Sequence, residues 1–424
     1  MSIAYFGVRK KPHASRLSLS ERTYLLLFIT LFFNSVLTGY ISVIFAYSDE
    51  LFSVFGLCCL LFRAGKRDWL LESRYVRAIY RVLALFLILG WISSFTSGIQ
   101  QSFSANMMDC FTLMKFFLIL YYSSVLFWKC DIKKIVGITY DITKVYLILG
   151  FIFYFISIAL NTQMVGEIRY GLRTFQFVNS NAGDYASILI VSLAILHIKM
   201  VYDGKRHIAM RLVAVFLIFM TLRGKSLGLL ATYVALIFIF NYVKTLSLKS
   251  MIILCALSLV GALSQIRYYF VDQVTPRALF LTNGIKTAND YFPFGAGYSS
   301  YGSNMAKIHY SPLYVKYGFN KVWGMNEEEE QYLNDNFWPM IAGQFGWIGV
   351  FLFLIILFFL FNIISKQIPQ KQLKIAGYII FFQLLFSSVG GPIFVHYIGC
   401  INILIYSLVL AVSKHNNSCI VSVS

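Results

Sequence analysis

Four cations in short polar breaks are the side chains of this 424-residue chain whose chemistry is most specific. Arg169 and Arg173 lie in one break between long apolar runs, and Arg223 and Lys225 lie in another. A guanidinium stays charged at physiological pH and can donate two parallel hydrogen bonds to a phosphate. If the apolar runs cross a membrane, these residues predict a phosphate or pyrophosphate site at the headgroup level. The alternative is that they bind lipid phosphates and fix helix ends.

The candidates for a general base lie in the longest polar break, residues 267–336. Asp335 is the first choice because it stands just before an apolar run, where a carboxylate could take the proton of a substrate hydroxyl. His309 and Glu330 come next, and His309 is the only histidine that we assign to this side. The alternatives are that Asp335 caps a helix, that His309 is structural, and that Glu330, in a run of glutamates, belongs to a solvated face.

Aromatic side chains are concentrated in the same break, which contains nine tyrosines. A flat ring with a hydroxyl suits the apolar face and the polar edge of a sugar, and this predicts glycan binding for Tyr298. The alternative is an aromatic belt at the membrane interface. The break contains no HxxxH or DxD spacing and no cysteine, and the chain has no CxxC pair and no P-loop. We therefore expect no metal and no cofactor.

Composition indicates which elements must position these residues. The chain is 58% hydrophobic and 13% charged, with a mean hydropathy of +0.71, which excludes an ordinary soluble domain. A helix of roughly 20 apolar residues crosses a bilayer. We expect an all-α, polytopic integral membrane protein with about twelve transmembrane helices and one large outer (periplasmic) loop. The predicted spans are residues 22–38, 41–62, 79–98, 109–128, 144–160, 181–199, 208–222, 225–243, 250–266, 337–362, 373–390 and 393–412.

The Lys and Arg residues are distributed asymmetrically. Of these 36 residues, 25 lie in the N-terminal arm and the alternate loops that twelve spans place on one side with both termini. The positive-inside rule assigns that side to the cytoplasm. The chain then divides into residues 1–266 with nine spans, the outer loop 267–336, and residues 337–424 with three spans. The net charge of +18 thus indicates topology and attraction to anionic lipid, not nucleic-acid binding.

Two features of the spans have more than one interpretation. Polar residues 48–50 interrupt the second span, so a first span that runs to Tyr47, followed by a re-entrant segment 51–62, is the alternative. Lys115 lies in the fourth span, where a charge in contact with lipid is costly. We expect Lys115 to face the protein interior, either paired with Asp109 or Asp141 or as part of a site.

Three short motifs carry a family resemblance. They are Arg223-Gly224 at the start of a span, residues 293–298 (PFGAGY) in the outer loop, and Asp335-Asn336 shortly before residues 346–349 (GWIG). Together with the twelve-span layout and a large outer loop before the last three spans, they resemble the O-antigen polymerase and O-antigen ligase superfamily over most of the chain. The ligase branch has a His-Asn pair where this chain has Asp335-Asn336, so the resemblance favours the polysaccharide polymerase branch.

The resemblance implies a pyrophosphate-binding role for Arg223, and for Arg173 or Arg169 from the earlier outer segment, with Asn336 at the same site. The implied activity is that of a metal-independent glycosyltransferase, an O-antigen or capsular polysaccharide polymerase in the bacterial inner (plasma) membrane. It would transfer a growing glycan from undecaprenyl pyrophosphate to a new lipid-linked repeat unit on the outer face. The implied partners are the undecaprenyl pyrophosphate-linked oligosaccharide, membrane lipid and a chain-length regulator protein. The alternatives are a ligase that transfers glycan to a lipid core and a lipid-linked oligosaccharide flippase or transporter.

Overall fold

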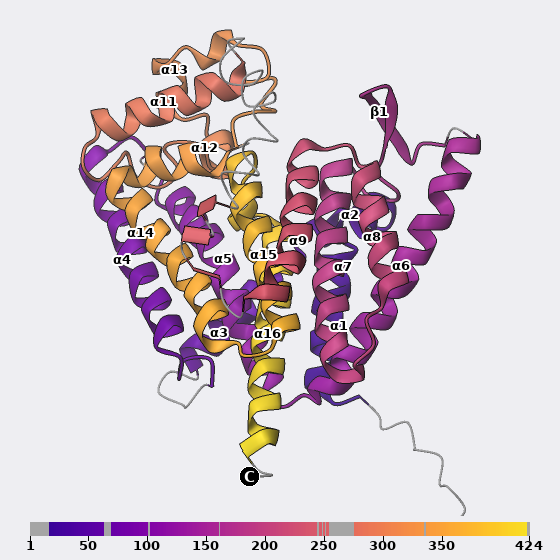
Figure 1. The fold of residues 1–424 in the computed structure, drawn as a ribbon. Helices are drawn as coiled ribbons and strands as arrows, with labels where there is room; N and C mark the ends of the chain where they lie inside the picture. The colour runs from indigo at the N-terminus through magenta and orange to yellow at the C-terminus, as the bar shows by residue number, and fades with distance from the viewer. Residues whose placement is uncertain are drawn as a thin grey trace, which may run out of the picture.

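The structure, a computed structural model, describes residues 17–62, 69–100, 102–160, 162–243, 246–247, 249–250, 252–253, 275–334 and 336–421. The protein is 76% helical and nearly all-α. Long helices lie side by side, and short elements collect at one end (Figure 1). The elements are α1 (Leu19–Phe32), α2 (Asn34–Tyr40), η1 (Val43–Tyr47), α3 (Ser48–Phe62), α4 (Arg74–Ser97), α5 (Phe103–Phe127), α6 (Ile132–Leu160), β1 (Val165–Arg169), β2 (Leu172–Phe175), α7 (Ala182–Asp203), α8 (Ile208–Met220), α9 (Gly224–Tyr242), α11 (Pro276–Asp290), α12 (Asn304–Ile308), α13 (Pro312–Lys316), η2 (Phe319–Lys321), α14 (Phe337–Gln367), α15 (Lys371–Val389), η3 (Ile393–Val395) and α16 (Tyr397–Val421).

Local sequence determines where several helices begin and end. Before α1, the Ser18 hydroxyl accepts from the Glu21 N–H and the Glu21 carboxylate accepts from the Ser18 N–H, which is a capping box. The side chain of Asn181 accepts from two N–H groups in the first turn of α7. The same helix ends at Gly204, whose φ of 65° is a left-handed conformation that glycine adopts without strain.

Within the described residues, nine helical stretches are long and apolar enough to cross a membrane. They are residues 43–62 (η1 with α3), α4, α5, α6, α7, α9, α14, α15 and α16. The chain is therefore a multi-pass membrane protein. Residues 43–62 form one apolar helical stretch of 20 residues, close to the second predicted span, residues 41–62.

Three predicted spans differ from the rest. The first is broken, since α1 and α2 meet at a bend of 71°, and α8 has only 13 residues. The bend is stabilised by Asn34, whose side-chain amide donates to Phe45 O at 2.8 Å and to Ser48 Oγ at 3.1 Å. The ninth predicted span, residues 250–266, lies largely outside the described residues.

Residues 275–334 form a folded unit and not an extended loop. Its short helices α11, α12, α13 and η2 surround an apolar core of their own. Tyr301 and Tyr314 are both fully buried in this core. The buried residues of the core are Phe280, Ala296, Tyr301, Ala306, Leu313, Tyr314, Phe319, Met325 and Leu333. We call residues 275–334 the outer unit.

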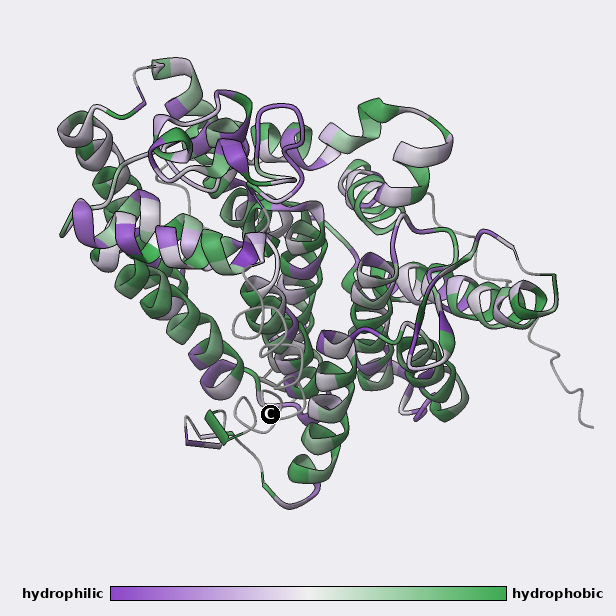
Figure 2. Ribbon diagram, turned by 90° about the horizontal axis from the view of Figure 1, so that it is seen from above, coloured by the Kyte–Doolittle hydropathy of each residue, from purple (hydrophilic) through white to green (hydrophobic). Residues whose placement is uncertain are grey.

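The outer unit and the β1–β2 hairpin lie at the same end of the helical bundle, opposite the C-terminal end of α16 (Figure 1). Seen from that end, hydrophilic ribbon is concentrated in the connecting segments and the outer unit, while the long helices are mostly hydrophobic (Figure 2). The predicted cationic segments and the predicted outer loop are therefore on one face of the molecule.

Candidate functional site

Arg169 and Arg223, predicted from two different breaks, converge on one carboxylate. Arg169 ends β1, and Arg223 immediately precedes α9. Their Nη2 atoms lie 3.1 Å and 2.9 Å, respectively, from the same oxygen, Oε1 of Glu167. The side chains of Arg169, Arg223 and Glu167 are 23%, 28% and 51% exposed. An anion from solvent can therefore reach both guanidiniums.

The hairpin separates Arg169 from Arg173. In the antiparallel pairing, Arg169 is opposite Leu172 and Arg173 is opposite Ile168. Directly opposite residues share a face of a hairpin, and successive residues alternate between faces. Arg169 and Arg173 therefore lie on opposite faces. The structure places Arg169 beside Arg223, whereas the sequence left the choice between Arg169 and Arg173 open.

Lys225, the fourth predicted cation, lies beside the start of α7. A Cβ atom on Gly183 would be 4.0 Å from Lys225 Cε. In the same turn of α7, the Asp184 carboxylate accepts from the Tyr397 hydroxyl at 3.2 Å. The beginnings of α7, α9 and α16 thus meet at this point. Because a helix N-terminus carries partial positive charge, Lys225 and α7 together favour an anion here.

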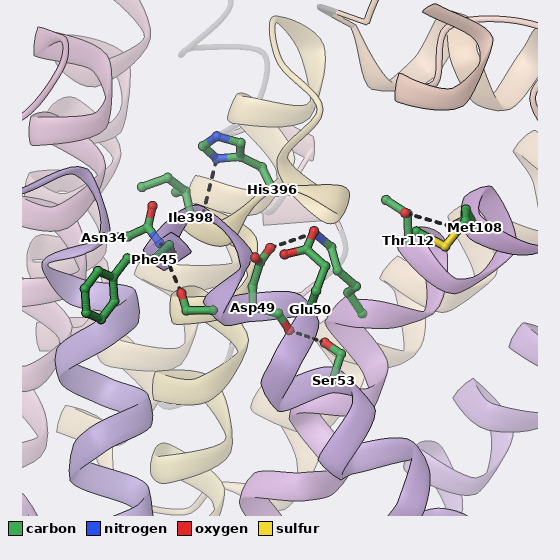
Figure 3. Close-up of polar contacts among 11 residues, drawn as sticks. Asn34, Phe45, Asp49, Glu50, Ser53, Met108, Thr112, His396 and Ile398 are labelled. Carbon is green, nitrogen blue, oxygen red and sulfur yellow. Dashed lines mark hydrogen bonds and ion pairs between the residues drawn. The ribbon is translucent and has the colours of Figure 1, made fainter. Parts of the chain in front are cut away.

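Lys115 makes a buried ion-pair cluster with the first turn of α3. Its Nζ lies 2.6 Å from Asp49 Oδ2 and 2.6 Å from Glu50 Oε1. The two carboxylates are labelled in Figure 3. The predicted partners were Asp109 and Asp141, and this prediction is wrong. The correct partners lie in the polar interruption of the second predicted span, because the fold packs α3 against α5. Residue spacing gave no signal for that packing.

His396 is a functional candidate that the sequence analysis missed. It lies between η3 and α16, at the end of the bundle that carries the hairpin, and Figure 3 shows it near Asp49 and Glu50. Burial lowers the pKa of the His396 imidazole, and the carboxylates of Asp184 and Glu50 oppose this shift. Nδ1 accepts from the Ile398 N–H at 3.4 Å.

The sequence analysis assigned only His309 to the outer side, whereas the structure places His396 at the same end of the bundle as the hairpin. The twelfth predicted span began at residue 393, which assigned His396 to the membrane interior. The structure begins α16 at Tyr397, after the short η3 turn. A histidine four residues after Gly390-Gly391-Pro392 was the signal, because such a turn marks a chain reversal at the end of a span.

The glycine motif of the outer unit packs on a break in α14. Gly346 has a φ of 62° and a ψ of −165°, which interrupts the helix. Gly295 and Gly297 also have positive φ values, of 83° and 87°. The N–H groups of Ala296 and Gly297 donate to two carbonyls of α14 just before the break, at 2.8 Å each. Two of the three motifs that carry the family resemblance are thus in direct contact.

Asp109 anchors this contact to α5. Its Oδ2 accepts from the Ser299 N–H at 2.6 Å and from the Gln344 side-chain amide at 2.9 Å. Asp109 is only 2% exposed, so it joins the outer unit, α5 and α14 inside the protein. Three serines of α4 add hydrogen bonds to residues 294–298: Ser93, Ser94 and Ser97.

Two predicted ligand residues are buried. Tyr298 is 0% exposed, and its hydroxyl donates to Leu87 O at 2.9 Å. Its ring packs against Trp91 and Phe345, which gives it a structural role, and we do not include it in the candidate site. Asn336 is 1% exposed at the start of α14, and its Oδ1 has no hydrogen-bond partner among the described residues. An orphaned buried oxygen is costly, so Asn336 stays a candidate for ligand contact.

Of the three predicted bases, two lie in the outer unit, away from the arginines, and the third lies outside the residues that the structure describes. Asp335, the first choice, is outside the described residues. His309 is exposed at the end of α12 in the outer unit. Glu330 lies 3.7 Å from Lys307 Nζ, also within the outer unit. His309 and Glu330 both belong to the outer unit, whereas Arg169 and Arg223 belong to the hairpin and the start of α9, and the catalytic roles of His309 and Glu330 stay predictions.

In the part of the chain that the structure describes, no group of three or more His, Cys, Asp or Glu side chains could hold a metal ion.

The candidate site has two parts. The first lies at the surface and consists of Arg169, Arg223 and Lys225 with Glu167. The second lies deeper in the bundle and consists of Lys115, Asp49, Glu50 and His396. In comparisons with known proteins, no family model and no curated protein matched this chain.

Proposed function

We propose that this protein is a polysaccharide polymerase of the O-antigen polymerase type. It transfers a growing glycan from undecaprenyl pyrophosphate to a new lipid-linked repeat unit, without a metal ion, on the outer face of a bacterial inner membrane. In this proposal the outer unit is periplasmic and both termini are cytoplasmic. A chain-length regulator is a further partner that the family resemblance suggests.

The observation that carries the proposal is the convergence of Arg169 and Arg223. Two guanidiniums from separate outer segments already share one carboxylate oxygen. A diphosphate offers more acceptor oxygens and more charge than that carboxylate, so the same pair can grip it at several points. Lys225 and the start of α7 add positive charge nearby.

The chemistry fits a clamp of fixed cations. Transfer breaks the bond between the anomeric carbon and the pyrophosphate, and the pyrophosphate gains negative charge as it leaves. Positive groups that are already in place stabilise this charge without reorganisation. The bond that breaks supplies the driving force, so the proposal requires no nucleotide.

Contact between the motifs also supports the proposal. Residues 293–298 and the Gly346 break resemble two separate elements of the O-antigen polymerase and ligase superfamily. In the fold these elements pack together and are held by Asp109. A shared structural unit explains why one chain would carry both motifs.

The test is reconstitution of the purified protein in liposomes with lipid-linked repeat units extracted from cells that carry this chain. We expect a ladder of longer lipid-linked glycans. Arg169→Ala and Arg223→Ala should each reduce ladder formation on the order of 100-fold. Lys414→Ala is the control. It removes an exposed cation near the C-terminal end of α16, opposite the hairpin, and should leave the rate of ladder formation within about twofold, because Lys414 makes only a weak surface ion pair.

Other outcomes would replace the proposal. Transfer of glycan to a core lipid acceptor without a ladder would identify a ligase. Movement of the lipid-linked unit across the bilayer without a new glycosidic bond would identify a flippase. Full ladder formation by both arginine variants would reject the clamp.

A further inference from the structure

The Asp49–Glu50–Lys115 cluster carries more negative than positive charge. Two carboxylates share one ammonium at 2.6 Å each. The side chains of Lys115 and Asp49 are both 4% exposed, whereas that of Glu50 is 35% exposed. An unbalanced charge at this depth is costly in a membrane protein and is therefore a sign of function. The cluster is suited to accept one proton.

Glu50 has a carboxylate oxygen that lacks a donor. Its Oε1 accepts from Lys115, but Oε2 is buried and has no hydrogen-bond partner among the described residues. A buried acceptor without a donor loses about 1–3 kcal/mol. A ligand hydroxyl, or a proton taken from one, would satisfy it. The Asp49 side chain is enclosed by the protein, whereas the Glu50 side chain is partly exposed, so Glu50 is the carboxylate that can meet a substrate when its side chain turns outward.

His396 links this cluster to the outer cations. The charges of Asp184, Lys115, Lys225 and Glu50 all act on its imidazole. Figure 3 shows His396 projecting from the segment before α16, near the carboxylates at the start of α3. Lys225 is two residues from Arg223, which contacts Glu167. His396 thus interacts electrostatically both with Glu50 and with a cation two residues from the proposed diphosphate clamp.

We infer that Glu50 is the general base of the transfer reaction and takes the proton of the acceptor sugar hydroxyl. This inference rests on the proposed function. As the acceptor oxygen forms its bond to the anomeric carbon of the donor, its proton moves to the Glu50 carboxylate. The bond from that carbon to the pyrophosphate breaks, and its electron pair stays on the pyrophosphate oxygen. Lys115 is a positioning residue that holds Oε1, and the proton later passes to water.

The first experiment compares Glu50→Gln with wild type in the reconstituted ladder assay. Glutamine keeps the shape of the side chain and an oxygen for Lys115, but it cannot take the proton. We expect kcat to fall on the order of 100-fold or more, while KM for the lipid pyrophosphate donor stays within about threefold because the clamp is intact. Glu72→Gln removes an exposed carboxylate, 58% exposed and paired with Lys414, and should leave kcat unchanged.

The outcomes separate the two proposals. If wild type makes no ladder, the proposed function is wrong. If wild type makes a ladder and Glu50→Gln keeps the wild-type kcat, only the base assignment is wrong. If Glu50→Gln raises donor KM without lowering kcat, Glu50 helps binding and is not the base.

A second measurement uses only the wild-type protein, so it tests the inference even when the Glu50→Gln protein does not fold. A hydrophobic carbodiimide, which reacts with carboxyl groups in apolar surroundings, is added to the reconstituted wild-type protein. We expect inactivation in step with a mass-spectrometric adduct on Glu50, and protection by lipid-linked repeat units. Complete modification of Glu50 with full activity, or inactivation with no adduct on Glu50, would overturn the assignment.

Discussion

At the scale of single residues, Glu167 acts as an internal anion. One of its carboxylate oxygens forms ion pairs with both Arg169 and Arg223, yet its side chain is half exposed. Exposed ion pairs contribute roughly 0–1 kcal/mol, so a diphosphate can displace Glu167 at little cost. The carboxylate keeps the two guanidiniums close together while no phosphate is bound.

Removal of the Glu167 charge should therefore strengthen anion binding. In Glu167→Gln, the arginines no longer have a competing carboxylate, and we expect the Kd for inorganic pyrophosphate to fall by about threefold to tenfold, as for the loss of a modest ion pair. Isothermal titration calorimetry in detergent at low salt measures this change. The matched control is Glu72→Gln, which removes an exposed carboxylate at another surface. Weaker pyrophosphate binding by Glu167→Gln would show that Glu167 contributes to the site by orienting the arginines.

His396 should make stability depend on pH. Burial lowers the pKa of His396 in the folded protein. Below the ordinary pKa of histidine the unfolded chain therefore binds a proton that the folded protein does not, and the free energy of unfolding falls as the pH falls. Thermal unfolding in detergent from pH 8 to pH 5 should show a larger drop for wild type than for His396→Gln. The groups whose charges act on the imidazole are Asp184, Lys225, Lys115 and Glu50. An equal drop in unfolding temperature for both proteins would contradict a lowered pKa of His396 in the folded protein.

At the scale of elements, the decisive feature is the break in α14 at Gly346. Its φ of 62° and ψ of −165° belong to a region that essentially only glycine occupies. A Cβ atom there would also clash with Pro293 O and Gly295 N of the outer unit. The glycine thus permits both the break and the contact of the two motifs.

Gly346→Ala should destabilise the protein by about 1–3 kcal/mol or more, because backbone strain and the clash both oppose the native contact. Thermal unfolding in detergent measures this loss. Gly137→Ala is the matched control, since Gly137 lies inside α6 with nothing within 4 Å of an added Cβ. That change should be neutral or stabilising by up to about 1 kcal/mol. Equal unfolding temperatures for the two variants would contradict this account of Gly346.

Hydropathy predicted the helical elements well, because a membrane span needs length and apolarity and both are local properties. The bend between α1 and α2 was not predictable, since Asn34 reaches partners beyond the next turn of the chain. The cations Arg169 and Arg223 were identified by residue type. Their shared contact with Glu167, and the pairing of Lys115 with Asp49, depend on tertiary packing that spacing does not encode.

At the scale of the whole molecule, one end of the bundle carries the hairpin and the outer unit, and the other carries the end of α16 (Figure 1). The proposed function requires the first end to face the periplasm. The positive-inside rule supports this orientation, because most Lys and Arg residues are assigned to the other side.

Thiol labelling of introduced cysteines tests this orientation. Asn320→Cys in the outer unit and Tyr170→Cys in the hairpin turn are both at exposed positions. A membrane-impermeant thiol reagent should label both in intact cells, above the level of the parent protein, whose native cysteines set the background. Lys414→Cys should react only after the cells are permeabilised. Labelling of Asn320→Cys only in permeabilised cells would reject the proposed function, because the reaction would then face the cytoplasm.

The hairpin and the outer unit stand apart at this end, over different helices, in both views of the molecule (Figures 1 and 2). If the anchored phosphate end of a substrate lies near Arg169, the sugars that reach the surface above α14 belong to an extended glycan. The spacing between the two protrusions would then act as a ruler, so that a long oligosaccharide is held more firmly than a single repeat.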